Sequence, residues 1–210
     1  MRIVRGAVWL LLCGAVVSSA VPLDAKEARR PAVGPLIIIH APHAQQFEVA
    51  MDEAELDWSR VPGAKARALG AQAQPAGSAR IVDSESVRAR AAFAPAANLT
   101  ELQGMAVALR TANPDAETYL VLYEPGRPKS KATRRLLTRE VALVLEPGQD
   151  PQQALTGLSV AAIRPVAGVA GGYVVDAIDP LAALDLAEQL RRQPGVRHAY
   201  PLLRRYHIKQ

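Results

Sequence analysis

Two Asp-Pro dipeptides in the last third of the chain limit its fold more than any other feature. Asp150-Pro151 and Asp179-Pro180 each follow an apolar run, and each opens a segment of the form Asp-Pro-x-x-Ala-Leu. An aspartate carboxylate accepts hydrogen bonds from the free N–H groups of a first helical turn, and proline suits the first helical position because it has no N–H to satisfy. Each pair therefore predicts the start of a short helix behind a strand.

Apolar runs rich in branched side chains surround these two helices and predict strands. Gly168, Gly171 and Gly172 predict a hairpin between the second and third strands. The order β-α-β-β-α-β predicts an α+β fold with a C-terminal ferredoxin-like domain over residues 139–203, in which a four-stranded antiparallel sheet carries two helices on one face and leaves the other uncovered. The predicted strands cover residues 141–145, 160–166, 173–177 and 196–203.

The residues before this domain predict a smaller, less regular α/β region over residues 35–125. Branched apolar runs and alternation of apolar and polar residues indicate strands. Thr100 and Gln103 match a capping box and so predict a helix start. The predicted segments are strands at 36–39, 47–51 and 119–123, a helix from Thr100, a surface loop at 61–78 and a basic connector at 126–138.

The first 20 residues have the features of a secretory signal peptide. Arg2 and Arg5 precede an apolar run that ends at Val17, and Ser18-Ser19-Ala20 provides the small residues of a cleavage site. The run is shorter than the ~20 residues that span a bilayer, so we expect cleavage after Ala20 and no membrane association afterwards. The mature protein, with a flexible start at residues 21–34, is then secreted or periplasmic. Export also argues against nucleic acid as a partner, although the sequence pI is about 9.7.

No set of residues with catalytic spacing occurs in the sequence. It lacks Gly-x-Ser-x-Gly and both common Gly-rich phosphate loops. The single cysteine excludes a Cys-based zinc cluster, and His40-x-x-His43 lacks an evident third ligand. The sequence therefore predicts no catalytic residue, no cofactor and no metal. The acidic residues over 48–57 predict a solvated face and not an acid–base pair.

The end of the chain carries the pattern of a known family. Residues 190–201 read Leu-Arg-Arg-Gln-Pro-Gly-Val-Arg-His-Ala-Tyr-Pro, which indicates a helix end, a Pro-Gly-Val turn and a strand that reaches a proline. With the export signal and the β-α-β-β-α-β order, this resembles the propeptide of subtilisin-like serine proteases. Residues 122–126 and 137–141 also resemble the long pro-regions of bacterial members, so the resemblance covers about residues 118–210.

Two departures from the family pattern bear on function. Tyr200 stands where the family usually has Glu, so the docking role of that Glu is not carried over. The catalytic patterns Asp-x-Gly, His-Gly-Thr and Gly-Thr-Ser-x-Ala do not occur. The chain is therefore expected to be the non-catalytic pro-part of such a peptidase, either a stand-alone inhibitor or the product of a truncated or split gene.

The resemblance implies a partner and a way of binding it. The partner is a subtilisin-like protease domain, in cis or in trans, which the propeptide inhibits or helps to fold as an intramolecular chaperone. The open sheet face would pack on surface helices of the enzyme, and the tail at 204–210 would lie in the substrate cleft as an added strand. Arg204 and Arg205 are candidates for a processing site or a subsite contact, with a solvated basic tail as the alternative. The residues expected in the cleft are Tyr206, His207, Ile208, Lys209 and Gln210.

A second function stays open at this point. An exported ferredoxin-like ligand-binding or regulatory module would have the same topology, because one topology serves many functions. It predicts a ligand pocket or a dimer formed through paired sheets. An enzyme is the third alternative, and the missing nucleophile–base pair argues against it.

Overall fold

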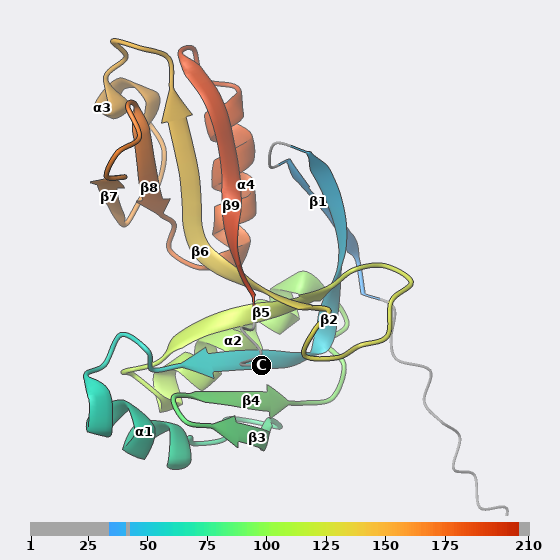
Figure 1. The fold of residues 1–210 in the computed structure, drawn as a ribbon. Helices are drawn as coiled ribbons and strands as arrows, with labels where there is room; N and C mark the ends of the chain where they lie inside the picture. The colour runs from blue at the N-terminus through green and yellow to red at the C-terminus, as the bar shows by residue number, and fades with distance from the viewer. Residues whose placement is uncertain (1–33, 41–42, 206–210) are drawn as a thin grey trace, which may run out of the picture. The chain divides into compact units, whose positions relative to one another are not determined.

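The computed structural model describes residues 34–40 and 43–205, which all belong to one compact unit. Within these residues the chain forms nine strands and four helices (Figure 1). The strand β1 (Leu36–His40) precedes two groups of six elements. The N-terminal repeat, residues 44–123, is β2 (Ala44–Asp57), α1 (Gly63–Ala71), β3 (Arg80–Glu85), β4 (Arg88–Ala92), α2 (Leu99–Ala112) and β5 (Glu117–Tyr123). The C-terminal repeat, residues 134–205, is β6 (Arg134–Leu145), α3 (Pro151–Ala154), β7 (Ala162–Pro165), β8 (Gly172–Asp176), α4 (Pro180–Arg191) and β9 (Val196–Arg205).

We call these groups repeats because they connect their strands in the same way. Each runs strand, helix, strand, strand, helix, strand, and the order in the sheet is β3-β4-β2-β5 in one and β7-β8-β6-β9 in the other. The pairing with the preceding strand also recurs, because β1 pairs with the start of β2 as β5 pairs with the start of β6. The register shifts at a similar place in each first strand, between Val49 and Ala54 in β2 and between Leu137 and Val141 in β6.

The predicted fold class is wrong, because the strands of the C-terminal repeat do not form a four-stranded ferredoxin-like sheet of their own. They belong to a nine-stranded antiparallel sheet, in the order β3-β4-β2-β5-β6-β8-β7 with β1 beside β2 and β9 beside β6. The link is the first half of β6, where Leu137 pairs with Leu120 and Arg134 pairs with Tyr123 of β5. The sequence analysis placed residues 126–138 in a connector, and it therefore cut off the residues that join the two repeats.

Side-chain caps mark the starts of α2, α3 and α4. Asp150 accepts a hydrogen bond from the Gln152 N–H, and Asp179 accepts one from the Ala182 N–H, so both predicted helix starts are confirmed. The cap of α2 is Asn98, which accepts from the Glu101 N–H, and not the predicted Thr100. The Asn98 and Asp179 backbones have almost the same conformation, with φ and ψ of −158° and 172° against −156° and 173°. The last helix of each repeat therefore starts with the same local geometry.

The segment predicted as a surface loop at 61–78 contains helix α1 instead. Its small residues serve close packing, because a Cβ added to Gly70 would lie 2.6 Å from the Ser86 carbonyl oxygen. Ala66 is buried in the core on the same helix. The lack of large apolar side chains therefore reflects the near approach of this helix to the β3–β4 turn.

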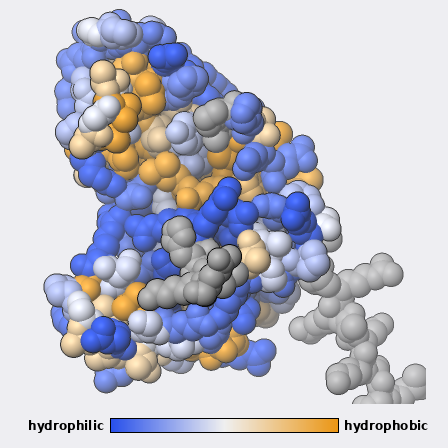
Figure 2. All heavy atoms as spheres, in the orientation of Figure 1, coloured by the Kyte–Doolittle hydropathy of each residue, from blue (hydrophilic) through white to orange (hydrophobic). Residues whose placement is uncertain are grey.

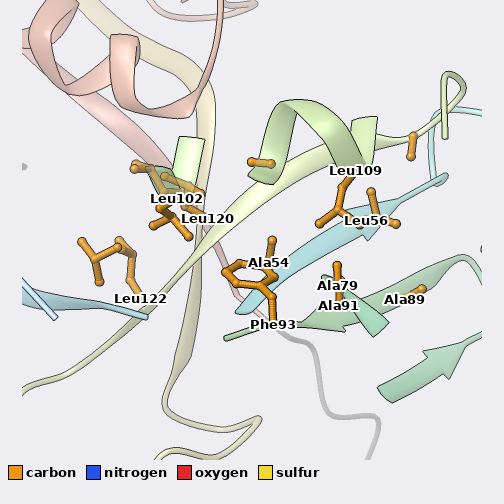
Figure 3. Packing of buried hydrophobic residues seen from close by; sticks show 14 of the residues in the cluster. Ala54, Leu56, Ala79, Ala89, Ala91, Phe93, Leu102, Leu109, Leu120 and Leu122 are labelled. Carbon is orange, nitrogen blue, oxygen red and sulfur yellow. The ribbon is translucent and has the colours of Figure 1, made fainter. Parts of the chain in front are cut away.

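Each repeat has its helices on one side of the sheet. In the N-terminal repeat, Leu102 and Leu109 of α2 share a core with Leu56 and Leu120 of the strands (Figure 3). In the C-terminal repeat, the side chains of β6, β8 and β9 that alternate toward α4 form a second core. That core includes Val141, Leu143, Val175, Ala199, Ala183, Leu186 and Leu190. The side chains that point to the opposite face of the sheet differ in chemistry and in burial between the two repeats.

Candidate docking surface

The face of the C-terminal repeat opposite its helices is apolar in its centre. Ala142 and Val144 of β6 alternate with the core residues of that strand, and Ala142 pairs with Val174 of β8. All three are half-buried, and none belongs to a buried cluster of the described residues. Figure 2 shows apolar atoms gathered on the viewer's side of this repeat. We call Ala142, Val144 and Val174 the uncovered face.

The sequence of β6 also carries a signal for this face. Residues 141–145 read Val-Ala-Leu-Val-Leu, which is apolar at every position. A strand with one solvated face shows alternation, whereas a continuous apolar run is typical of a strand that is covered on both faces. The described residues cover only one face of β6 here, so the pattern indicates a second covering surface.

Tyr200 lies at the edge of the uncovered face. It pairs with Ala142 in the register of β9, packs against the core of the N-terminal repeat, and lines a hollow together with Ile39 and Phe47. The residue that departs from the family pattern is therefore engaged with the β1–β2 strands of its own chain. A Glu at this position would bring a carboxylate against apolar side chains, which is unfavourable.

The acidic residues of β2 are buried, so the predicted solvated face over 48–57 is wrong for three of them. Glu53, Glu55 and Asp57 are at most 6% exposed. They alternate along the strand, so they share the face opposite α1 and α2. Arginines from distant segments neutralise them, with Arg90 3.1 Å from Glu53, Arg134 3.5 Å from Glu55, and Arg88 and Arg204 3.1 and 3.3 Å from Asp57.

We call the surface formed by Glu53, Glu55, Asp57 and their arginine partners the closed face. Two tyrosines of β5 also lie on it. The Tyr123 hydroxyl donates to Glu53 across 2.5 Å, and Lys129 of the β5–β6 loop lies 5.4 Å from the centre of the Tyr123 ring. Burial and the hydrogen bond to Glu53 raise the pKa of Tyr123 to about 12. Burial also raises the pKa of Tyr119, while the neighbouring Arg204 acts in the opposite direction. Both phenols therefore stay protonated at neutral pH.

A closed ring of six ion pairs joins the two repeats. Going round the ring, the nitrogen–oxygen distances are 2.9, 3.6, 3.6, 2.7, 2.5 and 2.7 Å. Its charges balance, because three arginines alternate with three carboxylates. The ring runs Arg60, Glu117, Arg139, Asp176, Arg164, Glu140 and back to Arg60. Nothing local in the sequence indicates this ring, because each residue pairs with partners in other elements.

The two arginines proposed as a processing site or subsite contact lie in strand β9. Arg204 pairs with Leu136 and Arg205 pairs with Arg135, so the peptide bond between them is part of the sheet. Cleavage there would require this strand end to open, because proteases bind their substrates as extended, unpaired segments. Arg204 is held by Asp57, whereas Arg205 is exposed. The residues expected in the cleft, Tyr206 to Gln210, and the signal cleavage residue Ala20 lie outside the described residues.

A hollow lies between α2, β5 and the start of α4. It has a volume of about 180 Å³ and mixes apolar side chains with Arg110, Arg139, Glu117 and Asp179. Arg139 and Glu117 are engaged in the ion-pair ring, and Asp179 caps α4 and accepts from Gln103. The described residues contain no group of three His, Cys, Asp or Glu side chains that could hold a metal ion.

Comparison with known proteins finds no match for this chain among protein-family models, curated proteins or solved structures. In the part of the chain that the structure describes, no helix has the length and apolar character to cross a membrane.

Proposed function

We propose that this chain is the non-catalytic pro-region of a bacterial subtilisin-like serine protease. It is exported by its N-terminal signal and binds a protease domain, in cis or in trans. It inhibits that domain and assists its folding by docking the uncovered face on the enzyme and by placing the segment after β9 in the substrate cleft. The sequence resemblance over residues 118–210 supports the partner class.

The observation that carries the proposal is the apolar uncovered face beside the strand that leads to the tail. Ala142, Val144 and Val174 present small and branched apolar side chains on one face of the sheet, and an apolar sheet face is commonly covered by helices. The face and the end of β9 belong to one sheet, so docking and tail placement are coupled. A preformed body lowers the entropic cost of binding the tail, which is how a small domain inhibits tightly.

Inhibition of a purified subtilisin tests the proposal. Residues 21–210 are expected to inhibit peptide hydrolysis at micromolar concentration or below. Val144→Glu, which puts a charge in the centre of the uncovered face, is expected to weaken inhibition at least about tenfold because the carboxylate would be desolvated against the enzyme. The matched control is Val107→Glu on the exposed side of α2, which should leave inhibition within about twofold.

Two results would count against the proposal that this chain is a pro-region which docks through the uncovered face. One is no inhibition by the wild-type chain of either a cognate or a related subtilisin. The other is equal inhibition by wild type and Val144→Glu, which would show that the uncovered face is not the docking surface.

The hollow between α2 and α4 favours one alternative, an exported ligand-binding or regulatory module. Its volume of about 180 Å³ is below the roughly 300–1,000 Å³ of sites for drug-sized ligands, so only a smaller ligand would fit, and Arg110 at its wall supplies a positive charge for a carboxylate. A thermal-shift screen with small carboxylates distinguishes this alternative. A concentration-dependent rise in Tm that Arg110→Ala removes would favour it, whereas a flat screen would disfavour it.

A further inference from the structure

Strand β9 reaches from one repeat to the other. Its first half packs with α4, and Ala199 lies in the core of the C-terminal repeat. Leu203, near its end, packs against the core of the N-terminal repeat. The strand pairs with β6 up to Arg205, where it meets Arg135. The end of β9 at Arg204 and Arg205 therefore lies beside the N-terminal repeat.

The Arg204 side chain makes two contacts with the N-terminal repeat at this strand end. Its Nη1 lies 3.3 Å from Oδ2 of Asp57, and its guanidinium carbon lies 5.2 Å from the centre of the Tyr119 ring. A planar guanidinium can bind a carboxylate and stack on an aromatic face at once, which an ammonium does less well. Asp57 and Tyr119 are 1% and 2% exposed and the Arg204 side chain is 30% exposed, so solvent screens these contacts only in part.

The acceptor of Arg204 is itself held in place. Oδ1 of Asp57 accepts a hydrogen bond of 2.6 Å from the Ser59 N–H, and Arg88 approaches Oδ2 to 3.1 Å. A fixed carboxylate on β2 and a fixed ring on β5 together define one orientation for the guanidinium. The N-terminal repeat thus offers a preformed receptor for the last side chain but one of β9.

From this geometry we infer that Arg204 is a positioning residue, by which the N-terminal repeat holds the end of β9 in place and so fixes the point from which the chain continues after residue 205. The inference rests on the proposed function, in which that segment enters a protease cleft. It gives the N-terminal repeat a role in inhibition, although the face of this repeat opposite its helices is already covered by charged side chains of the same chain. We call the contacts of Arg204 with Asp57 and Tyr119 the anchor. Without the anchor the end of β9 gains conformational freedom, and binding to the enzyme must then order it at a cost in conformational entropy.

The test compares Arg204→Ala with Arg197→Ala in residues 21–210. Arg197 lies in the same strand, is exposed, and has no ion pair among the described residues, so it controls for the loss of one positive charge. Arg204→Ala is expected to raise the inhibition constant about tenfold and to speed hydrogen exchange of the backbone N–H groups of residues 202–205. Arg197→Ala should change both by less than about twofold.

A conservative variant separates positioning from general stability. Arg204→Lys keeps the charge but loses the planar group, so it is expected to recover part of the inhibition, to about threefold weaker than wild type. Should Arg204→Ala lower Tm strongly, Arg204→Lys replaces it as the test variant, with exchange at 202–205 as the measure. Tm changes without a change in exchange or inhibition would overturn the inference.

The two proposals fail in different ways. A wild-type chain that inhibits no subtilisin contradicts the proposed function, while exchange at residues 202–205 still tests the anchor. A wild-type chain that inhibits, together with an Arg204→Ala variant of equal inhibition and unchanged exchange, contradicts the anchor alone.

Discussion

The two repeats share one topology but use the face opposite their helices differently. In the N-terminal repeat this face carries Glu53, Glu55 and Asp57, and arginines of the same chain close it. In the C-terminal repeat the corresponding face carries Ala142, Val144 and Val174, and no described residue closes it. One topology thus carries two different surfaces, a charged face that is satisfied inside the chain and an apolar face that the described residues leave uncovered.

The largest difference between the faces is expected in stability. Asp57→Ala on the closed face should lower the free energy of unfolding by about 3 kcal/mol, because it leaves Arg88 and Arg204 without their shared carboxylate. Val144→Ala on the uncovered face should cost less than about 1 kcal/mol, since that side chain has solvent on one side. Urea unfolding followed by circular dichroism measures both.

Asp52→Ala is the matched control for the closed face. Asp52 lies on the same strand, and its carboxylate has no ion pair among the described residues. Its loss should change the free energy of unfolding by no more than about 0.5 kcal/mol. Equal costs for Asp57→Ala and Asp52→Ala would show that the buried charges do not hold the closed face.

Alkaline pH should loosen the closed face at a pH set by its tyrosines. Burial raises the pKa of Tyr123 from 10.0 to about 12, so the folded state favours the protonated phenol. The protonated phenol therefore contributes on the order of 2 kcal/mol to the free energy of unfolding. This contribution is fully present below pH 10 and is lost as the pH rises through 12. The urea midpoint should therefore fall steeply between pH 10 and 12.

Tyr123→Phe sharpens that experiment. The variant has no phenol to ionise at this position, so its urea midpoint should fall less between pH 10 and 12, with Tyr119 responsible for the remaining slope. A variant with the same alkaline slope as wild type would place the sensitive group elsewhere.

The smallest effect is expected at the boundary of the two repeats. Arg60→Ala opens the ion-pair ring at a side chain that is 42% exposed, so it should cost no more than about 1 kcal/mol, and less at high salt. Urea unfolding at 0.05 and 1 M NaCl measures this, with the exposed Arg110→Ala as control. A cost that does not fall with salt would argue against an electrostatic role for Arg60.

Local signals in the sequence identified the elements better than their assembly. Asp150 and Asp179 predicted helix starts because a cap acts on its own first turn. The acidic strand was misjudged because its partners Arg88, Arg134 and Arg204 lie far away along the chain. Arg134 and Arg135 suggested a connector, yet they start β6 because Glu55 and Glu124 pair with them.

The candidate site was predictable only in part. The apolar strand at 141–145 was found, but its second apolar face was not interpreted, and Arg204 was assigned to a free tail. Nothing local to Arg204 indicates Asp57 or Tyr119 as its partners, because a register between strands is set by the whole sheet.

The central position of β6 has a consequence for the order of events on the ribosome. When residues up to 145 have emerged, β6 can pair with β5, but its other edge waits for β9, the last described strand to be made. An unpaired strand edge is a template for wrong partners. The second edge of β6 is therefore covered only when residues 196–205 are available to pair with it.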